Sequence, residues 1–313
     1  MLQSIASQDV DEQAARLRGW HQTYAQMSPG RFTGTYTEVR FDDLHLFVEY
    51  TSKGLFQSGE LSDGVVALGV PLQLSGSGVF CGAITNDTTV HHFSGDGGFE
   101  FYSPAELIMG GVVLSRDRVL SALSDDEAAS IESALDHPHL SAVQANKIAV
   151  MREFLRGFFE MLENAPRLME NAPLQRSLRD SVISNVTELL VEDSHPEGEL
   201  ISLSKRWQIV ARARDFILSR PESPTSILDV CKAIGVSRRT LQYCFQDVLN
   251  LNPIAFLRMV RLNGVRRMLR TCASVSEAAT YWGFWHFGHF SRDYKQLFGE
   301  LPSETYRRFN GKG

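Results

Sequence analysis

Side chains that can hydrogen-bond to the edges of DNA bases occur at two places in the last third of the chain. At the first place, two arginines precede a glutamine and a tyrosine: Arg238, Arg239, Gln242 and Tyr243. Arginine can form two hydrogen bonds with guanine, and glutamine can do the same with adenine. The second place has the corresponding residues Phe287, Gly288, Ser291 and Arg292, with Lys295 further along. Because this second set is poorer in polar groups, we expect the first to discriminate bases more strongly.

The arginine pair has an alternative role that the sequence leaves open. Arg238 and Arg239 could contact phosphate oxygens alone, which positions a protein on DNA without reading its sequence. Loss of a base contact weakens binding to one sequence, whereas loss of a phosphate contact weakens binding to all sequences.

A repeated pattern of helix, glycine turn and helix would position both sets. Each copy has a serine followed three residues later by an acid, which is a capping box, and a glycine that ends the first helix. These residues are Ser226, Asp229 and Gly235 in the first copy, and Ser274, Glu277 and Gly283 in the second. Ser237 caps the second helix of the first copy, and the second copy has one more residue after its glycine.

A predicted helix within residues 253–271 joins the two copies and carries five arginines, of which we expect Arg261 to be structural. A helix of about 17 residues spans about 25 Å. With the width of each helical hairpin added, the two second helices would lie about one DNA turn apart, roughly 34 Å, and could enter successive major grooves.

Charge is unevenly distributed along the chain. Residues 205–313 contain 18 basic and 8 acidic side chains, whereas residues 1–204 contain 13 and 29. The net charge of −6 therefore conceals a basic C-terminal part and an acidic N-terminal part. This asymmetry is typical of a chain whose basic part faces a polyanion, although chance clustering of surface charge is the alternative.

The N-terminal part has the pattern of a small β domain. Residues 10–27 place apolar side chains at three- and four-residue spacings, which predicts an amphipathic helix. From Phe32 to Leu114, short alternating or apolar runs are separated by glycines. We interpret these runs as strands of a cupin-like β barrel or jelly roll, whose interior could hold a small effector.

A helical region follows over residues 119–192. Five apolar residues in it form a heptad-like seam: Ile148, Met151, Leu155, Phe158 and Leu162. Such a seam could pack against the same helix of a second chain and form a homodimer. The alternative is that this face covers the barrel.

The predicted fold class is α+β, with an N-terminal barrel, a helical dimerisation layer and an all-α C-terminal domain. The predicted boundaries are 1–118 for the first helix and barrel, 119–192 for the helical layer, 193–204 for an acidic linker and 205–313 for the two helix-turn-helix units.

No catalytic motif is evident in the sequence, so we predict a chain that is not an enzyme and that needs no cofactor. The four cysteines are scattered without a CxxC pair, and Cys81 has no evident partner base. His91 and His92 are adjacent, so in a strand only one of them can face the barrel interior. His286 and His289 have a spacing that could hold a metal ion, but we favour core packing or contact with the DNA backbone for their aromatic neighbourhood.

Two other functions stay open at this point. One is a cupin-like metalloenzyme fused to a DNA-binding tail, and the other is an architectural protein that bends DNA without base preference. The N-terminus lacks the pattern of a signal peptide, and the longest apolar stretch, residues 65–74, is shorter than the about 20 residues that cross a bilayer. We therefore expect a cytoplasmic protein.

Residues 205–308 resemble the AraC/XylS family of transcription regulators. The matching pieces are IGVSRRTLQYCF in the first hairpin, RLNGVRRML in the joining helix and FGELPSETYR near the end. The resemblance implies two helix-turn-helix units joined by a long helix, sequence-specific binding to double-stranded DNA, and activation of transcription through contact with RNA polymerase.

Two further segments are similar to ethanolamine-utilisation regulators of the EutR type. They are FTGTYTEVRFDDLHLFVEYT and WGFWHFGHF. The same subfamily contains pseudomonad virulence and quorum-sensing regulators such as CdpR. This resemblance implies ethanolamine and adenosylcobalamin as effectors.

Overall fold

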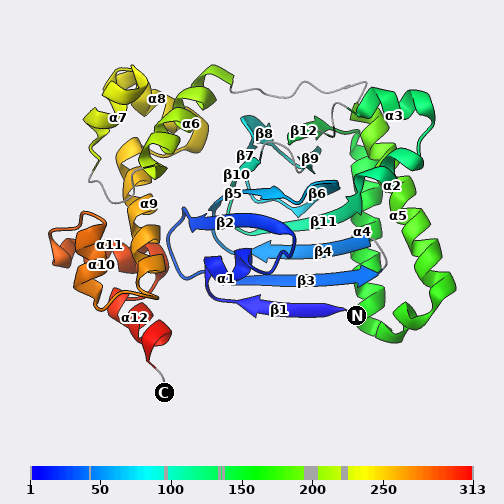
Figure 1. Ribbon diagram of the computed structural model, residues 1–313, viewed down its shortest axis with the longest axis horizontal. Helices are drawn as coiled ribbons and strands as arrows, with labels where there is room; N and C mark the ends of the chain where they lie inside the picture. The colour runs from blue at the N-terminus through cyan, green and yellow to red at the C-terminus, as the bar shows by residue number, and fades with distance from the viewer. Residues whose placement is uncertain are drawn as a thin grey trace. The chain divides into compact units, whose positions relative to one another are not determined.

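The computed structural model describes residues 2–41, 44–94, 98–132, 135, 138–193, 204–219 and 225–311. The chain divides into two compact units (Figure 1). Unit 1 consists of Met1–Tyr24, Thr33–Ser52 and Phe56–Ser202, and unit 2 of Ala25–Phe32, Lys53–Leu55 and Leu203–Gly313. Apart from its two end residues, the predicted linker, 193–204, lies outside the described residues.

Unit 1 is built on two β-sheets over its described residues. The larger is antiparallel, with the strand order β1 (Gln3–Ser7), β3 (Gly34–Phe41), β4 (Leu44–Thr51), β11 (Leu107–Ser115), β6 (Val65–Gln73), β9 (Thr89–Ser94) and β12 (His139–Ala142). The smaller has the order β2 (Trp20–Gln26), β5 (Leu55–Leu61), β10 (Phe99–Ser103), β7 (Gly78–Phe80) and β8 (Ala83–Thr85). Two packed sheets, together with the helical unit 2, confirm the predicted α+β class.

The larger sheet is buried on both faces, and side chains along each strand point alternately to one face and to the other. On β4, Leu46 packs in the cluster that contains the helices, whereas Phe47 packs in a second cluster with Phe80 and Phe99 of the smaller sheet. Successive strand residues point to opposite faces, so the two clusters share the strands without sharing side chains. One face therefore lies under helices and the other faces the second sheet.

The helices of unit 1 are α1 (Val10–Ala14), α2 (Arg116–Ser121), α3 (Asp125–Ile131), α4 (Ala145–Asn164) and α5 (Ala172–Asp193), with a 3-10 turn at Pro166–Glu170. The predicted seam lies on α4, and its five side chains are buried inside unit 1. Leu155 approaches β11 so closely that a Cβ at Gly110 would lie 2.8 Å from it. The seam thus covers the sheet, as the alternative interpretation held, and dimerisation stays a prediction without an exposed surface at these residues.

The predicted helix over residues 10–27 is wrong. The helix is confined to α1, and Trp20 begins strand β2 after Gly19, which has a φ of +85°. Helix α1 ends at Ala14 with the right-handed cap residue Ala15, and the alternation of Trp20, Gln22, Tyr24 and Gln26 has the two-residue period of a strand. The four-residue spacing of Trp20 and Tyr24 fits both periods, so the helical interpretation extended too far.

Unit 2 is helical in its C-terminal portion, as predicted. Its helices are α6 (Ser204–Leu218), α7 (Ile227–Ile234), α8 (Arg238–Leu249), α9 (Pro253–Met268), α10 (Val275–Tyr281), α11 (Phe287–Phe298) and α12 (Pro302–Asn310). None of the helices over the described residues combines the length and apolar character needed to cross a membrane.

Both glycine turns form as predicted. Gly235 and Gly283 adopt φ values of +72° and +78°. Ser226 and Asp229 form the reciprocal capping box. At the second copy the reciprocal bond is displaced: Ser274 accepts from the Glu277 N–H, but the Glu277 carboxylate accepts from the N–H of Ala273.

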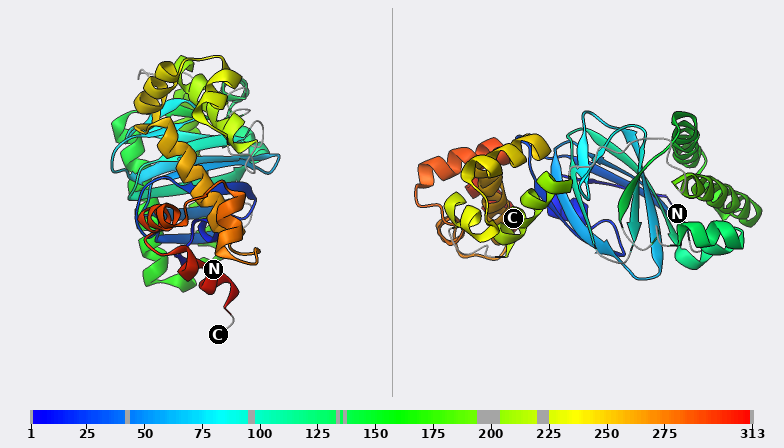
Figure 2. Two further views of the ribbon diagram at one scale, coloured as in Figure 1. Left: turned by 90° about the vertical axis from the view of Figure 1, so that its left-hand side faces the viewer. Right: turned by 90° about the horizontal axis from the view of Figure 1, so that it is seen from above.

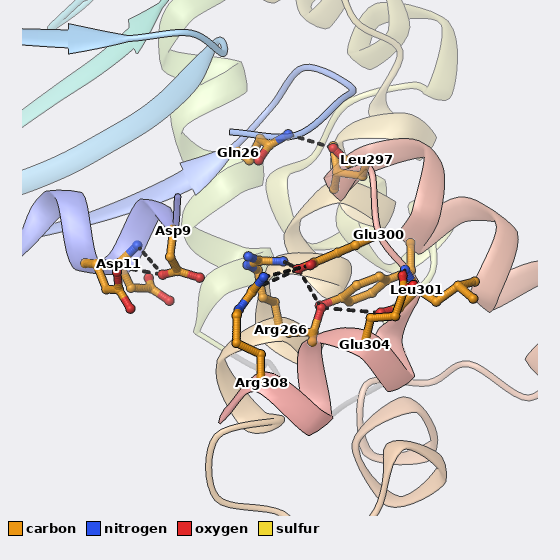
Figure 3. A network of polar contacts seen from close by, with 12 residues as sticks. Asp9, Asp11, Gln26, Arg266, Leu297, Glu300, Leu301, Glu304 and Arg308 are labelled. Atoms are coloured by element: carbon orange, nitrogen blue, oxygen red, sulfur yellow. Dashed lines mark hydrogen bonds and ion pairs between the residues drawn. The ribbon is translucent and has the colours of Figure 1, made fainter. Parts of the chain in front are cut away.

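A buried carboxylate after α11 joins helices α9 and α12 (Figure 3). Glu300, between α11 and α12, accepts a hydrogen bond from Arg266 of α9 at 2.8 Å and two from Arg308 at 2.7 and 2.8 Å. Thr305 donates a further bond at 2.7 Å. Burial alone would raise the pKa of Glu300, but the hydrogen bonds from Arg308, Thr305 and Arg266 outweigh it and lower the pKa.

Helices α9 and α10 meet at a glycine. A Cβ at Gly264 would lie 2.2 Å from the indole ring of Trp282, so the ring occupies the space of the missing side chain. We expect Gly264→Ala to cost about 1–3 kcal/mol of stability because the ring must shift in a packed core. Urea-induced unfolding followed by circular dichroism measures this. Gly157→Ala on α4 is the matched control: no atom lies within 4 Å of the position that its Cβ would take, so it should gain about 0.5–1 kcal/mol. A stabilised Gly264→Ala variant would contradict this packing.

The Glu300 network predicts a pH-dependent contribution to stability. Glu300→Gln leaves Arg266 buried without a carboxylate, which should cost about 3–5 kcal/mol at pH 7. Because the folded pKa is lowered, the contribution is present above the unfolded pKa of about 4.3 and is lost as the pH falls through the folded value. Urea unfolding of both proteins from pH 7 to pH 3 should show the difference shrinking.

Asp247→Asn is the control for the Glu300 variant. Asp247 pairs with Arg206 at 2.5 Å, but both side chains are exposed, so the change should cost less than about 1 kcal/mol. Equal losses in the two variants would contradict a special role for the buried carboxylate.

Candidate nucleic-acid interface

Helix α8 presents the first predicted set of DNA-reading residues to solvent. Arg238, Arg239, Gln242 and Tyr243 are all exposed. The opposite face of the helix, which includes Leu241 and Phe245, is buried in unit 2. Ser237 accepts the Thr240 N–H at 3.0 Å and so begins the helix immediately before the arginine pair. The four side chains therefore lie on an ordered helix, with none of them committed to the core.

Arg239 and Tyr243 contact each other across one helical turn. The guanidinium of Arg239 donates to the Tyr243 hydroxyl at 3.2 Å and lies 5.4 Å from the centre of its ring. Residues four apart lie on one face of a helix, and a guanidinium over a tyrosine ring is electrostatically favourable. Tyr243 thus restricts the orientation of Arg239 while most of the tyrosine, 60%, stays exposed.

Helix α11 presents the second predicted set. Phe287, Gly288, Arg292 and Lys295 are exposed, and Ser291 is half-buried. The inward face is formed by Phe290, Tyr294, Leu297 and Phe298, all buried. Arg292 lies 2.7 Å from the Nδ1 atom of the exposed His289, one turn earlier. As predicted, the helix begins one residue later relative to its glycine turn than α8 does.

Trp285 does not pack in the core. We expected core packing or contact with the DNA backbone for its aromatic cluster, and Trp285 is 68% exposed, just before α11 begins, so only the second alternative stays open for it. Its neighbour Phe287 is 47% exposed, whereas Phe284 is half-buried and Phe290 is buried. Trp285 lies between the turn glycine and the helix, where no helical period applies, so periodicity could not assign its environment.

Helix α9 connects the two helix pairs. The pairs α7–α8 and α10–α11 lie at opposite ends of α9 (Figures 1 and 2). Its 16 residues correspond to about 24 Å of helix. Each unit of the repeat therefore holds its second helix at a separate end of one continuous rod.

Several arginines of α9 bind groups of the neighbouring segments of unit 2. Arg261 donates to the backbone oxygen of Thr225 at 2.8 Å, which confirms its predicted structural role. Arg258 pairs with Asp293 of α11 at 3.2 Å, and Arg266 pairs with Glu300. These three arginines are engaged with the protein itself, so the exposed cations on α8 and α11 are the stronger candidates for DNA contact.

A short N-terminal segment also belongs to unit 2, which the sequence did not predict. The amide of Asn263 on α9 pairs with both backbone groups of Gln26, accepting its N–H at 2.8 Å and donating to its C=O at 2.9 Å. The Gln26 side chain donates to the Leu297 oxygen of α11 at 2.6 Å (Figure 3). Side-chain amides that bind backbone groups leave no periodic pattern, so this contact had no readable signal.

The histidine pair of unit 1 lies on strand β9. His91 is buried between the sheets, and its Nε2 atom lies 2.7 Å from the Thr85 hydroxyl. His92 points to the other face, where it contacts Ser141 and stacks on His139. Burial lowers the pKa of His91 to about 3, so it is neutral at physiological pH. Over the described residues, no three His, Cys, Asp or Glu side chains gather as a metal site would require.

Comparisons with known proteins place the C-terminal helices in a family. Residues 230–308 match the model of a helix-turn-helix domain. A probable thc operon regulatory protein of Rhodococcus erythropolis is 38% identical over 103 residues, which are 32% of this chain and 31% of that protein. XylDLEGF operon transcriptional activator 1 of Pseudomonas putida is 27% identical over 155 residues, 48% of this chain and 43% of that protein.

A solved structure also resembles this part of the chain. It is a probable AraC family transcriptional regulator from Rhodopseudomonas palustris CGA009, 33% identical, covering 33% of this chain and 97% of that chain with a TM-score of 0.31. The chain spans less than half the length of the two operon regulators that it matches. Their names agree with the prediction of a DNA-binding regulator rather than an enzyme. The C-terminal helix-turn-helix part of the chain is thus similar to the corresponding part of regulators of the AraC/XylS family.

Proposed function

We propose that the whole chain is a sequence-specific transcription regulator that places α8 and α11 in two successive major grooves of its operator. The observation that carries this proposal is the exposed, ordered arginine face of α8, repeated in weaker form on α11 at the other end of α9. Helices of this kind read bases with side chains near their N-termini. Basic side chains elsewhere in the C-terminal part supply affinity by releasing counterions from the phosphates.

We propose that α8 is the stronger reader of the two. Arg238, Arg239 and Gln242 offer hydrogen bonds to guanine and adenine, and Tyr243 restricts the motion of Arg239. On α11, Arg292 and Lys295 are the cationic groups, and the exposed rings of Trp285 and Phe287 suit contact with thymine methyl groups. Specificity at the second site then rests more on apolar contact than on hydrogen bonds.

The regulatory part of the proposal concerns unit 1. Activation through contact with RNA polymerase agrees with the name of the Pseudomonas putida relative, which is a transcriptional activator. We place the protein in the cytoplasm, where its DNA lies, and propose a homodimer that uses a face other than the buried seam of α4. The EutR-type or CdpR-type subfamily, with ethanolamine and adenosylcobalamin as effectors, is supported by the two resembling segments alone.

Through strand β2, the binding of an effector in unit 1 could change the position of the DNA-binding helices. Its residues Trp20, Gln22 and Tyr24 line a cavity between the two sheets. The same strand ends at Gln26, which is hydrogen-bonded to α9 and α11. A shift of β2 on ligand binding would therefore act on the helices through a continuous backbone.

Binding to selected DNA tests the proposed base readout. The full chain is used to select its preferred sequence from a random duplex pool, and affinity for that sequence and for a scrambled one is measured by gel shift at several salt concentrations. Arg239→Ala should lose about 1–3 kcal/mol on the selected sequence and little on the scrambled one.

Arg167→Ala is the matched control, because it removes the same charge from an exposed position of unit 1. It should leave both affinities within about twofold, since it lies outside the proposed interface. Equal losses for Arg239→Ala on the two duplexes would assign it to a phosphate. A wild-type chain that binds scrambled DNA as tightly would favour an architectural DNA binder instead.

A further inference from the structure

We infer that the cavity between the two sheets of unit 1 binds a small organic cation whose ammonium group pairs with Glu49. This inference names the chemical class of the effector and rests on the proposed function only for its consequence in transcription. It is carried by three features of the described residues: a buried carboxylate with no cationic partner, walls made of aromatic rings, and a cavity that matches one ammonium group in size.

Glu49 is an uncompensated acid. Its side chain is buried, and it accepts hydrogen bonds from the Gln13 amide at 3.0 Å and from the Tyr24 hydroxyl at 3.1 and 3.2 Å. Within the part of the chain that the structure describes, no Lys, Arg or His side chain pairs with it. Burial raises the pKa of Glu49 to about 7, against the opposing effect of these hydrogen bonds. A buried carboxylate without a counter-charge is costly, so a proton or a bound cation would stabilise it.

Glu38, on the neighbouring strand β3, shows the usual arrangement by contrast. It is also buried, but its carboxylate pairs with Arg40 at 3.0 Å and with His45 at 2.9 Å. Burial would raise the pKa of Glu38, yet the arginine and its other partners lower it. The chain thus compensates one buried acid of this sheet internally and leaves the other open toward the cavity.

The cavity walls are suited to a cation. Trp20 packs with its ring centre 4.8 Å from that of Phe93, 5.6 Å from that of Phe99 and 6.0 Å from that of Phe47, and all four line the cavity with Glu49. Aromatic faces carry negative potential and attract ammonium groups. An anion would be repelled by the carboxylate, and a neutral apolar ligand would leave the carboxylate unpaired.

The size of the cavity limits the ligand. Its internal volume is about 20 Å³, enough for about one water molecule, and an ammonium group is of similar size. A short carbon chain attached to that group requires wall side chains to move. Met109 lines the cavity, and its unbranched side chain has three rotatable bonds, so it can make such room. We therefore assign the site to compact alkylammonium ions rather than to large or multiply charged ligands.

Calorimetric titration of the full chain, without DNA, tests the assignment. The probes are n-butylammonium, neutral 1-butanol and anionic butyrate at equal ionic strength. Butylammonium should bind at least about tenfold more tightly than the other two, because only it compensates the buried charge. Because burial raises the pKa of Glu49 to about 7, binding should release protons near neutral pH and none at pH 9. Titration in buffers of different ionisation enthalpy measures this release.

Two variants locate the effect. Glu49→Gln should lose about tenfold or more in butylammonium affinity and all of the proton release, whereas Glu38→Gln should retain both. If Glu49→Gln does not fold, the relative affinities of the three probes and the proton release of the wild-type chain still test whether the cavity binds a cation. Butanol binding as tightly as butylammonium, binding without proton release at pH 7, or no binding of any probe would overturn the inference.

A gel shift with the selected DNA separates this inference from the proposed function. Loss of cation binding with DNA binding retained refutes the ligand class alone. Cation binding without DNA binding refutes the proposed function and leaves the ligand site standing.

Discussion

The proposed mode of DNA binding depends on one geometric constraint, the continuous helix α9. A helix of 16 residues keeps its ends at a separation of about 24 Å, because each residue adds about 1.5 Å. Both helix pairs pack against it, and the pairs lie at its two ends. The contacts of Arg261 with Thr225 and of Arg258 with Asp293 join it to both sides. A kink or break in α9 would change the separation of α8 and α11, and no exposed side chain could compensate.

The two buried glutamates show how charge is used differently in the two units. Glu300 is surrounded by Arg266, Arg308 and Thr305, so its charge is compensated and joins helices α9 and α12. Among the described residues, Glu49 has only neutral donors around it, and it lies in the wall of a cavity. The first arrangement stabilises a fold, because removal of any partner leaves a buried charge. The second leaves a binding opportunity, since a ligand can supply the missing positive charge.

Strand β2 connects the cavity of unit 1 to the helices of unit 2 through the covalent chain. Its inner residues Trp20 and Tyr24 lie at the cavity, and its last residue, Gln26, is bound by Asn263 and Leu297. An element that contributes to the proposed ligand cavity and to the helix-turn-helix unit can carry a conformational change along the chain itself. The hydrogen bonds of Gln26 are buried, so they would resist local separation of the strand from α9.

Much of unit 2 could be predicted from the sequence because its signals are local. Capping serines, turn glycines and apolar residues at three- and four-residue spacings act within one or two helical turns, and they correctly predicted α7, α8, α10 and α11. The extra residue after Gly283 was also readable, since the apolar positions of α11 are displaced by one relative to α8. The exposure of Arg238 and Arg239 follows from the same helical period.

Two signals were ambiguous because two arrangements share them. The four-residue spacing of Trp20 and Tyr24 fits both a helix and a strand, and only the place of β2 beside β5 decided for a strand. The apolar seam of α4 fits both a dimer contact and a cover for a sheet, because both bury the same stripe.

The sequence by itself determined the helix-turn-helix repeat, its caps and its turns, since these depend on residues close together in the chain. The tertiary structure alone decided which arginines bind Glu300 or Asp293, that Asn263 holds Gln26, that Trp285 is exposed and that Glu49 has no counter-charge among the described residues. These properties depend on neighbours far apart in the sequence. The free energy of a buried charge or amide is set by those neighbours, so no local pattern of residue types could reveal it.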